Sequence, residues 1–135
     1  MPPFLLQITI PLLLGLFHFI GPVPADLVAD GGHLSPCASP AHCARATWQV
    51  ADSSVALDQL SEVIKTTPRT EIVTQRDNYL HATYSSRIFG FVDDLELAAN
   101  DDVTLEARSI SRLGESDLGV NAQRLENLSK SINIQ

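Results

Sequence analysis

Basic charge is scarce in this sequence. Nine lysine and arginine residues stand against sixteen aspartate and glutamate residues, so the formal net charge is −7 over 135 residues. A domain that binds nucleic acid needs a basic face for the phosphates, and an anionic membrane surface makes the same demand. The composition therefore argues against both partners and favours one soluble domain, since a chain of this length has room for one.

Charge is entirely absent from the first twenty-five residues, which contain no Asp, Glu, Lys or Arg. Residues 4–20 are almost wholly apolar, and Val23 and Ala25 after them are the small residues that signal peptidase prefers before its cut. Our first interpretation of residues 1–25 is a secretory signal peptide cleaved after Ala25. The alternative is an uncleaved membrane anchor, because residues 4–20 are just long enough to span a bilayer. Either interpretation predicts an extracytoplasmic domain (secreted, periplasmic or membrane-anchored), with an organelle lumen as a further option.

Cysteine is equally scarce, and both cysteines, Cys37 and Cys43, lie in residues 26–45. We interpret that segment as a linker and cysteine loop, because it is rich in Gly, Pro, Ala and Ser and has no helical or strand periodicity. In an exported chain the two cysteines are expected to form a disulfide. A metal site that also uses His33 and His42 is the alternative, but the spacing matches no strong metal signature. We expect no metal and no other cofactor.

The remaining residues, 46–135, have the pattern of one α+β domain. Apolar positions from Ala51 to Thr67 recur with helical spacing, with Asp52 among the possible N-caps and Pro68 ending the helix. Alternating patterns then predict strands at Thr70–Gln75, Tyr79–Ser85, Phe89–Ala98 and Val103–Ser109, and a closing helix at residues 120–132. The order α-β-β-β-β-α predicts two layers: a four-stranded antiparallel sheet with helices on one face.

The stretch between the last predicted strand and the closing helix concentrates polar side chains, so we expect a binding site there. Gly114 and Gly119 would allow a tight loop, and Asn121 would cap the helix, whose N–H groups could face an anion held by arginines. The candidate ligand-binding residues are Arg108, Ser109, Ser111, Arg112, Asp117, Asn121 and Arg124.

Strand alternation places Asp93 and Asp94 on opposite faces of the third predicted strand. Asp93 shares its face with phenylalanines and leucines, so its carboxylate needs a partner, for which Arg108 and Arg112 are the candidates. The pair could be purely structural, or the arginines could keep donors free for an acidic ligand. His81 is expected at the surface or within the sheet rather than as a catalytic base.

Three blocks of this sequence, taken together, resemble the domain of unknown function 1499 family. The blocks are Leu34–Cys43, Phe89–Glu96 and Arg108–Asn121 with Arg124, and the resemblance covers roughly residues 34–132. It implies an exported, membrane-associated or organellar setting. It implies no established activity.

Three functions follow from these patterns. The first is a non-enzymatic extracytoplasmic domain that binds a small acidic ligand or a partner protein through residues 108–124. The second is a hydrolase or transferase that uses Asp93 or Asp117 with the arginines as an anion clamp. The third is a structural accessory of an envelope or membrane complex. We assign no catalytic residue, because no histidine accompanies the serines of this stretch in sequence. Open, unpaired arginines would favour binding, and fully paired arginines would favour a structural role.

Overall fold

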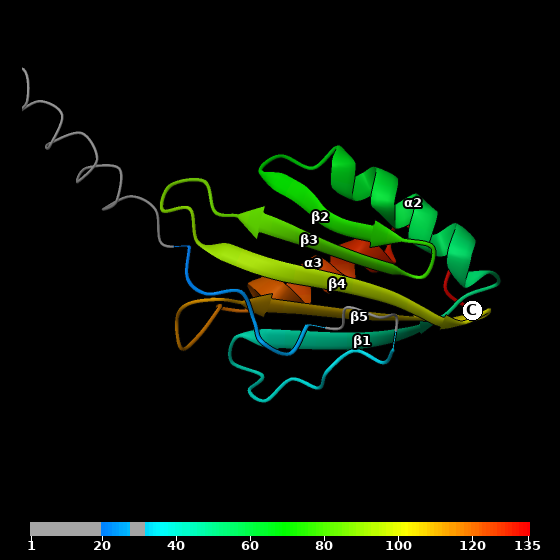
Figure 1. Ribbon diagram of the computed structural model, residues 1–135, viewed down its shortest axis with the longest axis horizontal. Coiled ribbons are helices and arrows are strands. Elements are labelled where there is room, and N and C mark those ends of the chain that lie inside the picture. Colours follow the sequence, from blue (N-terminus) through cyan, green and yellow to red (C-terminus); the bar gives the residue numbers. More distant parts are fainter. Residues whose placement is uncertain (1–19, 28–31) are drawn as a thin grey trace, which may run out of the picture.

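The computed structural model describes residues 20–27 and 32–135, so most of the predicted signal peptide or anchor lies outside the described residues. The described chain is an α+β domain with one antiparallel sheet and two helices (Figure 1). Within these residues no helix has the length and hydropathy needed to span a membrane. In chain order the elements are β1 (Cys43–Gln49), α2 (Ser53–Lys65), β2 (Thr70–Arg76), β3 (Tyr79–Ser85), β4 (Val92–Asp101), β5 (Thr104–Ser111) and α3 (Val120–Ser129).

The sheet has five strands rather than the predicted four. Its order is β1-β5-β4-β3-β2, so β2 to β5 form a meander and β1 pairs antiparallel with the free edge of β5. β1 has little strand pattern in the sequence, because its inward positions include Ala44 and Ala46 and alanine has little strand preference. Trp48 is the one large inward residue of this strand. β1 also begins at Cys43, inside the segment interpreted as a linker.

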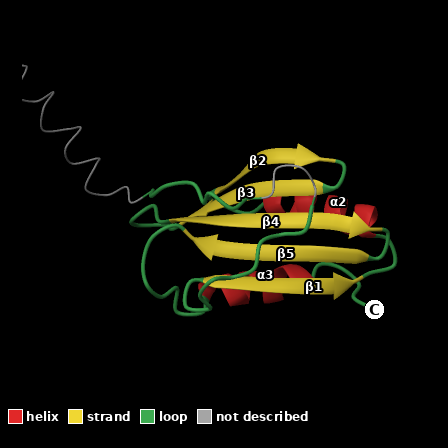
Figure 2. Cartoon of the chain, turned by 60° about the horizontal axis from the view of Figure 1, so that its bottom comes forward, coloured by secondary structure: helices red, strands yellow, loops and turns green. Residues whose placement is uncertain are grey.

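Both helices pack on the same face of the sheet, which we call the helix face (Figure 2). α2 contacts β2 to β5, whereas α3 contacts β1 and β5. Asp52 caps α2 as predicted, accepting a hydrogen bond from the Val55 backbone N–H at 3.1 Å. The core between helices and sheet is mainly aliphatic, and its fully buried members include Leu60, Ile64, Leu80, Leu95, Leu97 and Leu105.

β4 begins three residues later than predicted, because the chain from Ser86 to Phe91 forms a closed loop. The Ser86 N–H donates to the Phe91 carbonyl and the Phe91 N–H donates to Ser86 Oγ, both at 2.8 Å. Gly90 has φ of 66°, a left-handed conformation that glycine adopts at little cost. The two phenylalanines that the alternation placed on β4 therefore belong to a loop at the end of the sheet.

The opposite face of the sheet, the outer face, is covered by an arm formed by residues 20–27 and 32–42 (Figure 2). Leu34 is buried with Tyr79 and Ala98 in a small second core. The predicted disulfide between Cys37 and Cys43 is present and ties the arm to the start of β1, with 5.6 Å between the Cα atoms. No group of metal-ligating side chains occurs among the residues that the structure describes. Much of the segment interpreted as a linker thus packs against the sheet.

Candidate functional site

The two faces of the sheet hold separate sets of ion pairs. Asp93 points to the helix face and pairs with Arg124 of α3, whereas Asp94 points to the outer face. Arg108 and Arg112, which we expected beside Asp93, lie on the outer face instead. The reason is strand parity: Glu96 is directly opposite Arg108 in the β4–β5 register, so these side chains emerge on the same side as Asp94.

On the outer face, Asp94 is fully buried and has two side-chain partners, Arg112 and His81. Arg112 forms a bidentate pair with it, from Nε to Oδ2 at 2.8 Å and from Nη2 to Oδ1 at 3.0 Å. His81 Nε2 lies 2.7 Å from Asp94 Oδ1, and this histidine is buried within the sheet, one of the two positions expected for it. Burial acts to raise the pKa of Asp94, but the hydrogen bonds from His81 and Arg112 outweigh it and hold the pKa below its usual value.

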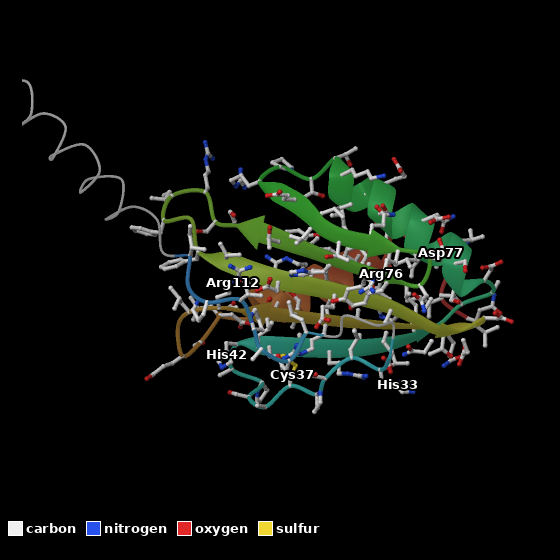
Figure 3. All side chains as sticks on the ribbon, in the orientation of Figure 1. His33, Cys37, His42, Arg76, Asp77 and Arg112 are labelled. Carbon is white, nitrogen blue, oxygen red and sulfur yellow. A yellow bond between two sulfur atoms is a disulfide. The ribbon has the colours of Figure 1, made fainter. Side chains whose placement is uncertain are left out.

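A second outer-face cluster surrounds Arg108, which is 2% exposed. Its Nη1 lies 3.2 Å from Glu96 Oε1, and its Nη2 lies 2.8 Å from Asp26 Oδ2 in the arm. The Tyr79 hydroxyl donates to Glu96 Oε2 at 2.6 Å, and burial together with this carboxylate raises the pKa of Tyr79 far above its usual value. Figure 3 shows His33 and Cys37 of the arm beside β1. The cluster therefore joins the arm to the sheet.

On the helix face, Arg124 is the centre of a polar cluster. Its Nη1 donates to Asp93 Oδ2 at 2.8 Å, and to Ser109 Oγ and Asn121 Oδ1 at 3.0 Å each. The guanidinium lies over the ring of Tyr84, 4.2 Å from the ring centroid, in a cation–π contact. Because the three hydrogen bonds all use Nη1, Nε and Nη2 of Arg124 donate to no other residue of the described chain.

Asn121 does not cap α3, so that prediction was wrong. Gly119 occupies the cap position with φ of 84° and has no side chain to offer. Asp117 replaces the cap by accepting from the Gly119 N–H at 2.8 Å and the Asn121 N–H at 3.4 Å. Asn121 is instead fully buried, donating from Nδ2 to Asp117 Oδ2 and Ser111 Oγ. Burial alone would raise the pKa of Asp117, but these donors lower it below its usual value.

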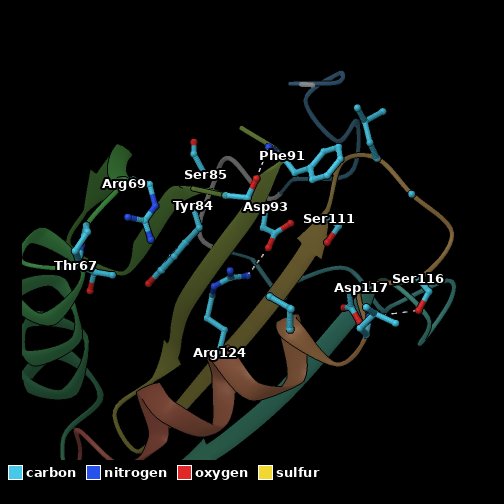
Figure 4. A pocket seen from close by; sticks show the side chains of 16 residues that line it. Thr67, Arg69, Tyr84, Ser85, Phe91, Asp93, Ser111, Ser116, Asp117 and Arg124 are labelled. Atoms are coloured by element: carbon cyan, nitrogen blue, oxygen red, sulfur yellow. Dashed lines mark hydrogen bonds and ion pairs between the residues drawn. The ribbon is translucent and has the colours of Figure 1, made fainter. Parts of the chain in front are cut away.

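A cavity of about 550 Å³ opens beside this cluster, at the end of the sheet (Figure 4). A second hollow of about 430 Å³ shares Thr67, Tyr84, Val120 and Arg124 with it. The wall of the first cavity comes from four separated parts of the chain: Thr67, Pro68 and Arg69; Tyr84, Ser85 and Ser86; Phe91 and Asp93; and Ser111, Leu113, Gly114, Ser116, Asp117, Leu118, Val120 and Arg124.

The structure brings part of the predicted site together. Ser111, Asp117, Arg124, Asp93 and Gly114 line the cavity. Ser109 and Asn121 lie behind Arg124, which they hold by hydrogen bonds, and Gly119 adjoins the wall at the start of α3. Three predicted residues lie elsewhere, on the outer face: Asp94, Arg108 and Arg112.

Two residues of the cavity wall, Arg69 and Tyr84, were not among the predicted site residues. Arg69 follows Pro68 in the connection between α2 and β2, and nothing in the local pattern relates that connection to residues 108–124. Tyr84 was placed correctly on a strand, but its contact with Arg124 depends on how α3 packs across the sheet. Strand alternation predicts which face of the sheet a side chain lies on. It does not predict which residues from distant parts of the sequence the side chain contacts.

Comparison with known proteins identifies the family. A family model described as "Protein of unknown function (DUF1499)" matches residues 32–132, which include all seven described elements and every residue that lines the cavity. No curated protein matches the chain.

Proposed function

The chain belongs to the DUF1499 family of proteins of unknown function, and we propose that it is an extracytoplasmic, non-enzymatic binding domain. Its ligand would be a small organic molecule with an acidic group, held in the cavity beside Arg124. The main support for this proposal is the cavity itself, which has a volume of about 550 Å³ and has Arg69 and Arg124 in its wall. Its volume falls in the range of small-molecule binding sites.

The charges of the wall favour an anionic group. Asp93 is already paired with Arg124, and Asp117 accepts hydrogen bonds from the start of α3. Arg69 is exposed and forms no ion pair within the described residues. Arg69 and Arg124 lie on either side of Tyr84 (Figure 4). A carboxylate, sulfonate or phosphate near Tyr84 would therefore meet the unpaired charge of Arg69 and the remaining donors of Arg124.

The rest of the wall favours an apolar body on the same ligand. Phe91, Leu113, Leu118 and Val120 line the cavity, and each is between 42% and 93% exposed. An apolar group placed against them would remove this surface from water, which contributes about 25 cal/mol for each Å² buried. The site thus suits a molecule that is acidic at one end and apolar at the other.

The wall does not suggest a reaction. It contains serines at 85, 86, 111 and 116, but no histidine of the described chain lines it to serve as their base. Asp93 is held by Arg124, and a paired carboxylate is a poor general base. The proposal therefore assigns no catalytic residue, no cofactor and no nucleic-acid partner.

The disulfide supports the extracytoplasmic part of the proposal. Disulfides such as Cys37–Cys43 persist in oxidising compartments and are rare in the cytosol. The uncharged apolar run at residues 4–20 is the second support, because it is typical of a segment that directs export or anchors a chain in a membrane.

Arg69→Gln tests the ligand site without disturbing the fold. Arg69 is exposed and unpaired in the described structure, so this variant should keep the wild-type stability. A suitable probe is 1-anilinonaphthalene-8-sulfonate, which combines an apolar body with an anionic group. Fluorescence titration should show its affinity reduced about tenfold, or about 1.4 kcal/mol.

The matched control is Arg87→Gln. Arg87 is also exposed, but it lies in the Ser86–Phe91 loop and does not line the cavity. Its removal should leave the affinity for the probe unchanged. Equal losses of affinity in Arg69→Gln and Arg87→Gln would mean that the probe responds to the overall charge of the protein. That result would contradict the proposal that the cavity binds the anionic group.

A further inference from the structure

We propose that the end of the sheet where the cavity lies rests in the interface of a phospholipid bilayer. Apolar side chains from two loops are exposed together at this end. We call this surface the apolar tip and define it by Ile88, Phe89, Phe91, Leu113 and Leu118. The inference goes beyond the ligand site and stands without it.

The apolar tip is unusually exposed for its composition. Leu118 is 93% exposed and Ile88 is 72% exposed, while the other three members are between 42% and 47% exposed. The rings of Phe89 and Phe91 lie 5.6 Å apart, and Phe91, Leu113 and Leu118 share the cavity wall. Single exposed apolar residues are common, but a contiguous group marks a surface that something else covers.

The path of the chain indicates what covers it. Gly21 lies directly against the tip, because a Cβ at this position would be 2.8 Å from Leu113 Cγ. Ile20 is half exposed beside it and is the last residue of the apolar run at residues 4–20. Ile20 and Gly21 therefore place the start of the described chain beside the tip. Where such a run enters a bilayer, the tip is the part of the domain brought to the lipid.

The two features would reinforce each other. An apolar segment that anchors the chain in a bilayer holds the rest of the molecule close to that bilayer, so a second membrane-contacting element meets the lipid at a high effective concentration. The large exposed residues of the tip are Phe, Leu and Ile, the types that enter the boundary between headgroups and acyl chains.

Charge indicates which lipid the tip would meet. Arg87 and Glu115 are exposed beside the apolar residues and offset each other, and the whole chain carries a net charge of −7. Anionic lipid would repel this domain, so we assign the tip to a zwitterionic surface that it enters through apolar contact. Its binding should accordingly change little with salt concentration.

The test uses the full chain in phosphatidylcholine vesicles and quenching of tryptophan by brominated acyl chains. The native protein has one tryptophan, Trp48, which is buried in the core and should not be quenched. Phe89→Trp and Leu118→Trp each add a second tryptophan at the tip. Brominated lipid should reduce the emission of the added tryptophan at least about twofold in both variants.

The control is Val103→Trp, because Val103 is 48% exposed in the turn between β4 and β5, at the far end of the sheet. Its tryptophan should show the same emission in brominated and ordinary lipid. Tip tryptophans that are quenched no more than the one at position 103 would overturn the proposal. Such a result, together with a dimer mass in detergent, would assign the tip to a second copy of the chain.

Discussion

Asp93 and Asp94 are neighbours in β4 whose side chains enter different environments. Alternation along the strand predicted their opposite faces from the sequence alone, and the structure has them so. The sequence did not show that both faces are covered, so Asp93 was expected to be the more buried of the two. The arm covers the outer face and excludes water from it, so Asp94 is the carboxylate that is fully buried. Asp93 keeps 13% of its side chain exposed.

Burial therefore predicts that Asp94→Asn is more damaging than Asp93→Asn. Removing the Asp94 charge leaves Arg112 and His81 without their buried partner, which should cost about 3–5 kcal/mol. Asp93→Asn breaks a pair that is partly open to water and should cost about 1 kcal/mol. Urea unfolding of both variants measures the difference. Equal losses would contradict the burial of the outer face.

The same residue gives a prediction for pH. Because the pKa of Asp94 is lower in the folded protein than in the unfolded chain, its contribution to stability is present above its unfolded pKa of about 4. That contribution is lost as the pH falls through the folded pKa. Urea unfolding between pH 6 and pH 2 should therefore show a shallower acid decline in Asp94→Asn than in the wild type. Parallel curves would mean that Asp94 titrates alike in both states.

At the scale of elements, the sequence predicted those with a strong periodic signal. α2, β2 and β3 lie within two residues of their predicted bounds, because helical spacing and alternation are clear there. β1 was missed because alanines occupy two of its inward positions, so its pairing with β5 left little trace in the local pattern. The arm was missed for a related reason. Its contacts come from isolated residues such as Asp26 and Leu34, and they follow no period.

The disulfide stabilises the junction of these two missed elements. Closing the short loop between Cys37 and Cys43 restricts the unfolded chain and should contribute about 2–2.5 kcal/mol. The double variant Cys37→Ala/Cys43→Ala should lose that amount in guanidinium unfolding. Wild-type protein unfolded with a reductant serves as the matched comparison, since it removes the same bond without changing the side-chain volume. An unchanged unfolding free energy in both cases would contradict this contribution.

At the scale of the whole molecule, the candidate site combines segments that the sequence could not relate. Residues 108–124 were identified by their polar composition, and Ser111, Asp117 and Arg124 from this stretch do line the cavity. The rest of the wall comes from the α2–β2 connection, from the end of β3 with Ser86, and from Phe91 with the start of β4. Their meeting depends on the packing of α3 across the sheet, which is a long-range property without a local signal.

The arginines now divide into two groups. Arg108 and Arg112 form buried ion pairs on the outer face, with Glu96 and Asp94 respectively. These pairs favour a structural role for both arginines. Arg124 is paired with Asp93 yet keeps Nε and Nη2 beside the cavity, and Arg69 has no ion pair in the described chain. The binding hypothesis therefore rests on Arg69 and Arg124, and no longer on the other two candidate arginines, Arg108 and Arg112.

The central claim is that the cavity holds an acidic, partly apolar molecule, and native mass spectrometry of protein from its own host tests it most directly. The spectrum should show a retained small molecule in the wild type and in Arg87→Gln, and its loss in Arg69→Gln. The polypeptide mass should also lack two hydrogens for Cys37–Cys43. A start at Asp26 would indicate a cleaved signal peptide, and a retained amino-terminal segment would indicate an anchor. Wild-type protein that carries no small molecule, with Arg69→Gln binding the sulfonate probe as tightly as the wild type, would contradict the account.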